Sequence, residues 1–123
     1  MPPKSRHLII KLTAGVESPE TLAQAFTVAA TAVASGAEVS LWLTGESSWL
    51  AVAGRAEEFV LPHAAPLAEL RDAVLAAGRL TVCSQCAARR SLTEADLLPG
   101  TLIRGAASFV DEVLQEGAQA LVY

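Results

Sequence analysis

Short apolar runs alternate with longer stretches of helical periodicity along this chain, and this alternation constrains the fold most strongly. His7–Leu12 is apolar at nearly every position, which is typical of a strand buried on both faces. Next, Ser18 and Pro19 mark the start of a helix and Gly36 marks its end. Further strands are expected at 38–43, 80–83, 101–104 and 119–123, and further helices at 47–53, 67–77, 84–90 and 106–116.

This order of elements predicts an α/β fold, a three-layer sandwich in which helices cover a mainly parallel five-stranded sheet. The 123 residues suffice for a single domain, 1–123, in which 1–5 are expected to form a loose N-terminal end. Hydrophobic residues make up 52% of the chain and charged residues only 18%, which excludes disorder. The shortage of charge also suggests that another subunit covers part of the surface.

The charge balance and the apolar runs limit the partners. A formal net charge of -4 argues against nucleic acid, because little would neutralise a run of phosphates. The longest uncharged run, between Glu20 and Glu38, is only 17 residues long and contains several threonines, so no membrane span is expected. The N-terminal apolar stretch 8–10 is ended by Lys11 and is too short for a signal peptide. We therefore expect a cytoplasmic protein whose thiols stay reduced.

Candidate chemistry lies where the strands end, because the active groups of open parallel sheets gather beyond their carboxyl ends. Cys83 stands between a strand and a helix, where unpaired N–H groups and the positive end of the helix dipole favour the nucleophilic thiolate. Cys86 follows three residues later, in the first helical turn. The loops that qualify carry Thr13 and Gly15 after the first strand, Thr44 and Gly45 after the second, and Cys83 after the third.

Other interpretations of the cysteines stay open. An isolated cysteine in an apolar strand is usually a small core residue. A zinc site needs four ligands and this pair supplies two, so His7 or His63 would have to join through folding or another subunit. We expect no metal. The chain contains no GxGxxG or GxxxxGK[ST] loop, no HExxH and no GxSxG, so no nucleotide cofactor or hydrolase elbow is indicated.

The region around the cysteines is similar to a known family. Its segments are 82–90 (VCSQCAARR), 94–100 (EADLLPG) and 105–110 (GAASFV). The chain resembles the DsrE/DsrF-like family of small sulfur-handling proteins, which includes sulfur-relay carriers of the TusD type. The similarity covers nearly the whole length and is most specific at 80–110. The spacing from Cys83 to Arg89 and Arg90 matches the carriers' reactive cysteine and the arginines after it. Ser91 replaces a glycine common in the carriers, and Cys86 is not part of their pattern.

The resemblance implies a DsrE/F-like fold, a trimer or hexamer, and a sulfurtransferase-like carrier that receives sulfur from a donor protein or passes it to an acceptor. Cys83 would hold sulfane sulfur as a persulfide, and Cys86 would stabilise or resolve it. Substrate contacts are assigned to Arg89, Arg90, Thr13, Gly15, Thr44 and Gly45.

Two other functions remain possible. One is a CxxC thiol-disulfide redox protein or sensor. The other is a non-enzymatic oligomeric module that binds a small ligand near Trp42, Trp49 and His63.

Overall fold

Five parallel strands form one sheet in the computed structural model, which describes residues 6–123. The expected loose end at 1–5 lies outside the described residues. The α/β sandwich is confirmed, with every pairing parallel. The strands are β1 (His7–Leu12), β2 (Glu38–Leu43), β3 (Arg79–Cys83), β4 (Leu102–Arg104) and β5 (Ala118–Val122), in the spatial order β4-β3-β2-β1-β5.

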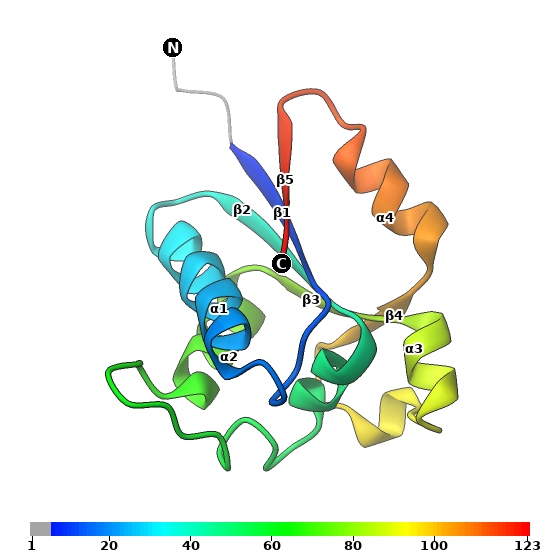
Figure 1. Ribbon diagram of the computed structural model, residues 1–123. Coiled ribbons are helices and arrows are strands. Elements are labelled where there is room, and N and C mark those ends of the chain that lie inside the picture. Colours follow the sequence, from blue (N-terminus) through cyan, green and yellow to red (C-terminus); the bar gives the residue numbers. More distant parts are fainter. Residues whose placement is uncertain (1–5) are drawn as a thin grey trace.

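Helices cover the two faces of the sheet unequally (Figure 1). The chain steps from β1 to β4 in one direction, so right-handed crossovers put α1 (Pro19–Ala34) and α2 (Leu67–Ala77) side by side on one face. From β4 the chain returns across the sheet to β5, and α4 (Ala106–Val113) therefore packs on the opposite face. Shorter helices occupy the carboxyl edge: η1 (Gly45–Ala51), α3 (Ser84–Arg89) and η2 (Glu94–Asp96).

The hydrophobic core lies between the sheet and the pair α1 and α2. Alternate strand residues such as Ile10, Leu41 and Val82 are fully buried there against Phe26 of α1. The other face of the same strands is more polar. It carries side chains from β1 (His7 and Lys11), β2 (Ser40 and Trp42) and the two ends of β3 (Arg79 and Cys83). The helix α4 covers this polar face. Polar side chains of the sheet therefore lie between the strands and α4, where the candidate site is found.

Several element bounds differ from those expected. The fourth helix ends at Val113 rather than at 116, because the Gln115 N–H bonds to the carbonyl of Glu112 three residues back, which tightens the last turn. The stretch expected as a helix at 47–53 is a 3₁₀ helix that begins earlier, at Gly45. The last strand is Ala118–Val122, one residue earlier than expected. Within residues 6–123, no helix has the length and apolar character needed to cross a membrane.

Candidate functional site

Cys83, the last residue of β3, lies in a cavity of about 250 Å³ between the carboxyl edge of the sheet and α4. Several elements contribute to its wall, including β1 through Lys11 and α4 through Phe109. The Cys83 side chain is partly exposed, so a small molecule can reach its sulfur. The lining residues are Lys11, Trp42, Thr44, Cys83, Ser84, Gln85, Gly105, Ala106 and Phe109, and we call this space the cysteine cavity.

The surroundings of Cys83 favour its thiolate. Burial opposes the loss of the proton, but hydrogen bonds from the backbone N–H and the thiol of Cys86 act in the other direction. The backbone N–H of Gln85 and the positive charge of Lys11 add to them. Together these contacts outweigh burial, and the pKa of the Cys83 thiol lies below its ordinary value.

Cys86 is buried, and its sulfur is fixed by a loop from a different strand. The backbone N–H of Gly45, the first residue of η1, donates to Cys86 Sγ over 3.2 Å. Thr44 anchors the same loop, because its hydroxyl donates to the carbonyl of Leu12 at the end of β1 over 2.9 Å. The structure thus brings Thr44, Gly45 and both cysteines together at one edge. Thr44 lines the cysteine cavity, whereas Gly45 contacts the second sulfur.

Thr13 and Gly15 lie in the neighbouring loop and do not line the cysteine cavity. The Thr13 hydroxyl donates to the carbonyl of Tyr123 over 2.7 Å, which joins the ends of β1 and β5. The backbone N–H of Gly15 donates to the Glu17 carboxylate. A Cβ at Gly15 would stand 2.8 Å from the backbone of Glu46, so glycine is required for the close approach of the two loops. Both residues shape this edge of the sheet.

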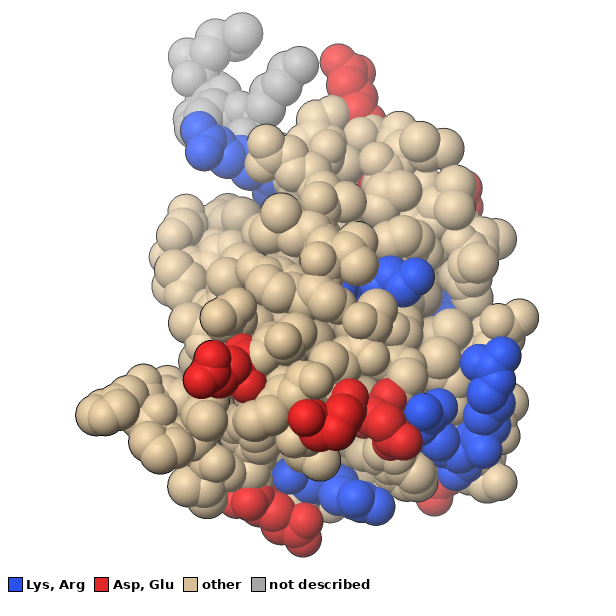
Figure 2. All heavy atoms as spheres, viewed as in Figure 1, with Lys and Arg blue, Asp and Glu red and all other residues tan. Residues whose placement is uncertain are grey.

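Arg89 and Arg90 end α3 and do not line the cysteine cavity. Arg90 donates from Nη1 to the Cys86 carbonyl over 3.1 Å, and its Nε lies 3.7 Å from a carboxylate oxygen of Glu46. Arg89 is exposed. Figure 2 shows basic side chains gathered where α3 lies in Figure 1, beside acidic ones. The arginines therefore form an outer basic surface, whereas the cation inside the cavity is Lys11.

A partly buried polar network supports the aromatic wall of the cysteine cavity. The Trp42 indole N–H donates to the Glu112 carboxylate over 2.7 Å, and the other oxygen of that carboxylate lies 3.0 Å from Arg79 Nη2. Arg79 also approaches His7 Nε2 at 3.4 Å. The Trp42 ring then meets the Phe109 ring edge to face, with 5.4 Å between centroids. This network fixes α4 against the sheet and sets the orientation of both aromatic rings.

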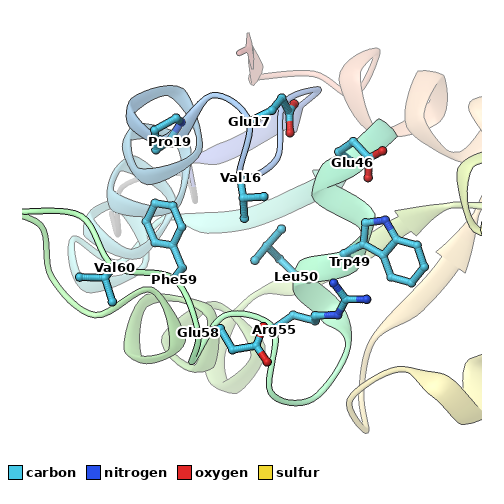
Figure 3. A pocket seen from close by; sticks show the side chains of 10 residues that line it. All are labelled: Val16, Glu17, Pro19, Glu46, Trp49, Leu50, Arg55, Glu58, Phe59 and Val60. Atoms are coloured by element: carbon cyan, nitrogen blue, oxygen red, sulfur yellow. The ribbon is translucent and has the colours of Figure 1, made fainter.

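A second, larger cavity of about 830 Å³ lies beyond the loop after β2 (Figure 3). Glu46 and Trp49 from η1 face Val16 and Phe59 across it, and the Arg55 guanidinium stacks 4.6 Å from the centre of the Trp49 ring. The three residues expected to lie around one ligand cleft instead line three different cavities of the chain. Trp49 lines this cavity, His63 lines another beside α1, and Trp42 lines the cysteine cavity.

Lys11 and Phe109 are the parts of the cysteine site that sequence analysis missed. A signal for Lys11 was present, because a lone charged residue inside a strand apolar on both sides must face a polar or charged environment. Phe109 lies in the segment 105–110 that carries the family resemblance, but it also matched the apolar face of its helix, so it was not assigned to the site. No cluster of three or more His, Cys, Asp or Glu side chains suited to a metal ion occurs in the described range 6–123.

One family profile and two solved structures are similar to this chain. Residues 7–123 match the profile described as the DsrE/DsrF-like family. The structure is similar to the crystal structure of the ychN protein from E. coli, with 14% sequence identity, a TM-score of 0.70 and coverage of 97% of this chain and 99% of that one. It is also similar to MTH1491 from Methanobacterium thermoautotrophicum, a protein of unknown function, with 11% identity, a TM-score of 0.68 and coverage of 97% and 100%. No curated protein matches the sequence.

Proposed function

The chain belongs to the DsrE/DsrF-like family, and we propose that it carries sulfane sulfur as a persulfide on Cys83. The single observation behind this proposal is the environment of Cys83, a partly exposed thiol with a lowered pKa beside a lysine and a second cysteine. Sulfur exchange requires an accessible thiolate with nearby positive charge. The resemblance of the chain to the sulfur-relay carriers of this family supports the same role.

In the proposed reaction, the Cys83 thiolate attacks the outer sulfur of a donor persulfide. The donor's S–S bond breaks, its inner sulfur leaves as a thiolate, and Cys83 becomes a persulfide anion. A thiolate of an acceptor protein then attacks the outer sulfur of that persulfide and regenerates the Cys83 thiolate. Both steps move one neutral sulfur atom without net oxidation or reduction, so the carrier needs no cofactor.

Cys86 is proposed to stabilise or resolve the persulfide. Its thiol already contacts the Cys83 sulfur, and its own sulfur accepts the Gly45 N–H. As a resolving residue, the Cys86 thiolate would attack the inner sulfur of the persulfide, release hydrosulfide and leave a Cys83–Cys86 disulfide. As a stabilising residue, it would donate its S–H to the persulfide anion.

The partner is proposed to approach over α3. Arg89 is exposed there, and Arg90 is held between Glu46 and the Cys86 carbonyl, next to the second sulfur. Thr13, Gly15, Thr44 and Gly45 are proposed to shape the edge that the partner meets, since they fix the two loops beside the cysteines.

We further propose a homo-oligomer, trimer or hexamer, that works in the cytoplasm, where thiols stay reduced. Support comes from β5, an edge strand exposed over most of its length, and from apolar side chains on consecutive elements: Val110, Leu114, Leu121 and Val122 are all at least 40% exposed. Much of the face in Figure 2 carries no charge. Light scattering of the purified chain tests this proposal, and a monomer at micromolar concentration would refute it.

The test of the carrier function is intact-mass spectrometry of the reduced protein after exposure to sodium polysulfide. The expected result is a gain of one sulfur atom that disappears in Cys83→Ser and persists in Cys86→Ser. Loading of Cys83→Ser through Cys86 would overturn the assignment. Loss of two hydrogens in the wild type alone, with no sulfur gained, would indicate a dithiol redox protein instead.

Ligand binding is a second candidate function, and the cavity of about 830 Å³ is the observation that favours it. Its volume falls within the ~300–1,000 Å³ typical of small-molecule sites. This function predicts that a bound small molecule changes the fluorescence of Trp49 and that replacing both cysteines leaves its affinity unchanged. A loss of affinity in Cys83→Ser would tie the ligand to the cysteine cavity.

A further inference from the structure

The cysteine cavity is lined by one charged side chain besides the thiol of Cys83, the ammonium of Lys11. Its volume of about 250 Å³ is below the ~300–1,000 Å³ typical of sites for drug-sized ligands. Trp42 and Phe109 make an apolar wall on the side of α4, whereas Thr44 and Ser84 bring hydroxyl groups. A space of this size and lining suits a small anion better than a coenzyme or an aromatic metabolite.

Lys11 is available to hold such an anion. Its Nζ lies 5.5 Å from the centre of the Phe109 ring, and no carboxylate in the described part of the chain forms an ion pair with it. Both residues line the cavity, and the cation–π contact places the face of the Phe109 ring against one side of the ammonium. In such a partly dry site, attraction between opposite charges is stronger than in bulk water.

The position of Lys11 follows from the sheet register. Lys11 pairs with Trp42 across β1 and β2, and Trp42 pairs with Thr81 across β2 and β3. Cys83 is two residues beyond Thr81, on the same face of the sheet. The lysine and the cysteine therefore line one wall of the same cavity, although 71 positions separate them in the sequence. The positive charge of Lys11 also lowers the pKa of the Cys83 thiol.

We propose that Lys11 binds the anionic end of a small inorganic sulfane-sulfur donor of the thiosulfate class and presents its outer sulfur to Cys83. This inference rests on the proposed carrier function and adds its substrate class. The donor thus enters the cysteine cavity as a free anion, while the arginines of α3 remain outside it for a protein partner.

The transfer balances without an external oxidant or reductant. The Cys83 thiolate attacks the outer sulfur of thiosulfate, the S–S bond of the donor breaks, and sulfite leaves with the electron pair of that bond. The products are a Cys83 persulfide anion and sulfite, and the total charge is unchanged. Two anions must meet for this reaction, so the contribution of Lys11 is to offset their mutual repulsion.

The first test compares an anionic with a neutral donor. Wild type, Lys11→Met and Lys11→Arg are exposed to thiosulfate or to dimethyl trisulfide at a pH where Cys83 is ionised, and sulfur gained at Cys83 is followed by mass spectrometry. Lys11→Met should load from thiosulfate about tenfold more slowly or worse, with a smaller change for the neutral donor. Lys11→Arg should recover most of the rate. Arg6→Gln removes an exposed positive charge just before β1, far from the cavity, and should behave as wild type.

The second test does not depend on sulfur chemistry. Alkylation of Cys83 is measured with iodoacetate, an anion, and with iodoacetamide, its neutral analogue. A change in thiol pKa alters both rates alike, so their ratio isolates attraction of the anion. The iodoacetate to iodoacetamide ratio should fall several-fold in Lys11→Met and hold in Lys11→Arg and Arg6→Gln.

The two tests separate failure of this inference from failure of the carrier function. If Lys11→Met loads from both donors at the wild-type rate and its alkylation ratio is also unchanged, the role of Lys11 is overturned and the carrier function is not. Loading from dimethyl trisulfide but not from thiosulfate in wild type overturns the substrate class. If no donor loads sulfur onto the protein, the carrier function is overturned together with the proposed substrate class, whatever the alkylation ratio.

Discussion

The backbone N–H of Gly45 donates to the sulfur of Cys86 over 3.2 Å, and this contact joins the loop after β2 to the helix after β3. It gives the second cysteine a fixed position, since the Cys86 sulfur is buried and held from a separate strand. The same loop presents Thr44 to the cysteine cavity and Glu46 to the larger one. Neighbouring residues 44–46 therefore line both cavities and donate a hydrogen bond to the Cys86 sulfur.

The loss of stability on replacing Cys86 should depend on whether the new side chain can accept the hydrogen bond from the Gly45 N–H. Cys86→Ala leaves this part-buried donor without its partner and should lower the free energy of unfolding by about 1–2 kcal/mol. Cys86→Ser keeps an acceptor oxygen and should lose less. Urea denaturation of the reduced proteins measures both values. Equal losses in the two variants would mean that the contact contributes nothing to stability.

Two glycines with positive φ form a matched pair for testing the loop after β2. Replacing Gly45 (φ 56°) or Gly36 (φ 89°) by alanine should lower the free energy of unfolding by about 1 kcal/mol in each case, because the left-handed conformation disfavours a side chain. A Cβ at Gly45 would also stand 3.0 Å from the Thr13 carbonyl oxygen, whereas at Gly36 it would meet nothing within 4 Å. Gly45→Ala alone should therefore change the alkylation rate of Cys83. A similar change in Gly36→Ala would contradict a local effect.

The carboxylate of Glu112 should be a main stabiliser of α4. Glu112→Ala removes the acceptor of the Trp42 indole N–H and the partner of Arg79, and should lower the free energy of unfolding by about 2 kcal/mol. Arg79 is half exposed and can regain water, which limits the loss. Glu112→Gln keeps an acceptor for the indole and should lose less. Urea unfolding followed by tryptophan fluorescence checks the order, and equal losses would contradict it.

The lowered pKa of Cys83 predicts its reactivity as a function of pH. Burial opposes ionisation, but the contacts from Cys86 and Gln85 and the Lys11 charge outweigh it. The thiolate fraction rises as pH passes upward through the pKa, so half-maximal alkylation by iodoacetamide should occur at a lower pH in the folded protein than in the urea-unfolded protein. Lys11→Met should move this midpoint upward. A wild-type midpoint at or above that of the urea-unfolded protein would refute the shift.

The order of elements and the fold class were predictable from local signals. The apolar run of β1, the Ser18–Pro19 helix start and the Gly36 helix end each depend on residues close in sequence, and so does the place of Cys83 between a strand and a helix. Helix ends were less predictable. The α4 bound at Val113 depends on how its last turn tightens before β5.

The position of Lys11 shows that closeness to Cys83 in the sequence does not identify the cation that lines the cysteine cavity. Arg89 and Arg90 are close to Cys83 along the chain, yet the turn of α3 carries them outside the cavity. Lys11 is far from Cys83 in sequence and lines the same cavity.

The sequence by itself determined a parallel α/β fold with a cysteine pair at the end of its third strand, because propensity, periodicity and capping act over a few residues. Only the tertiary structure decided which groups surround that pair. The register of parallel strands sets Lys11 and Trp42 on the cavity side, the loop after β2 brings the Gly45 N–H to Cys86, and α4 covers the site from the opposite face. Such contacts depend on how separate elements align in space, which local pattern does not encode.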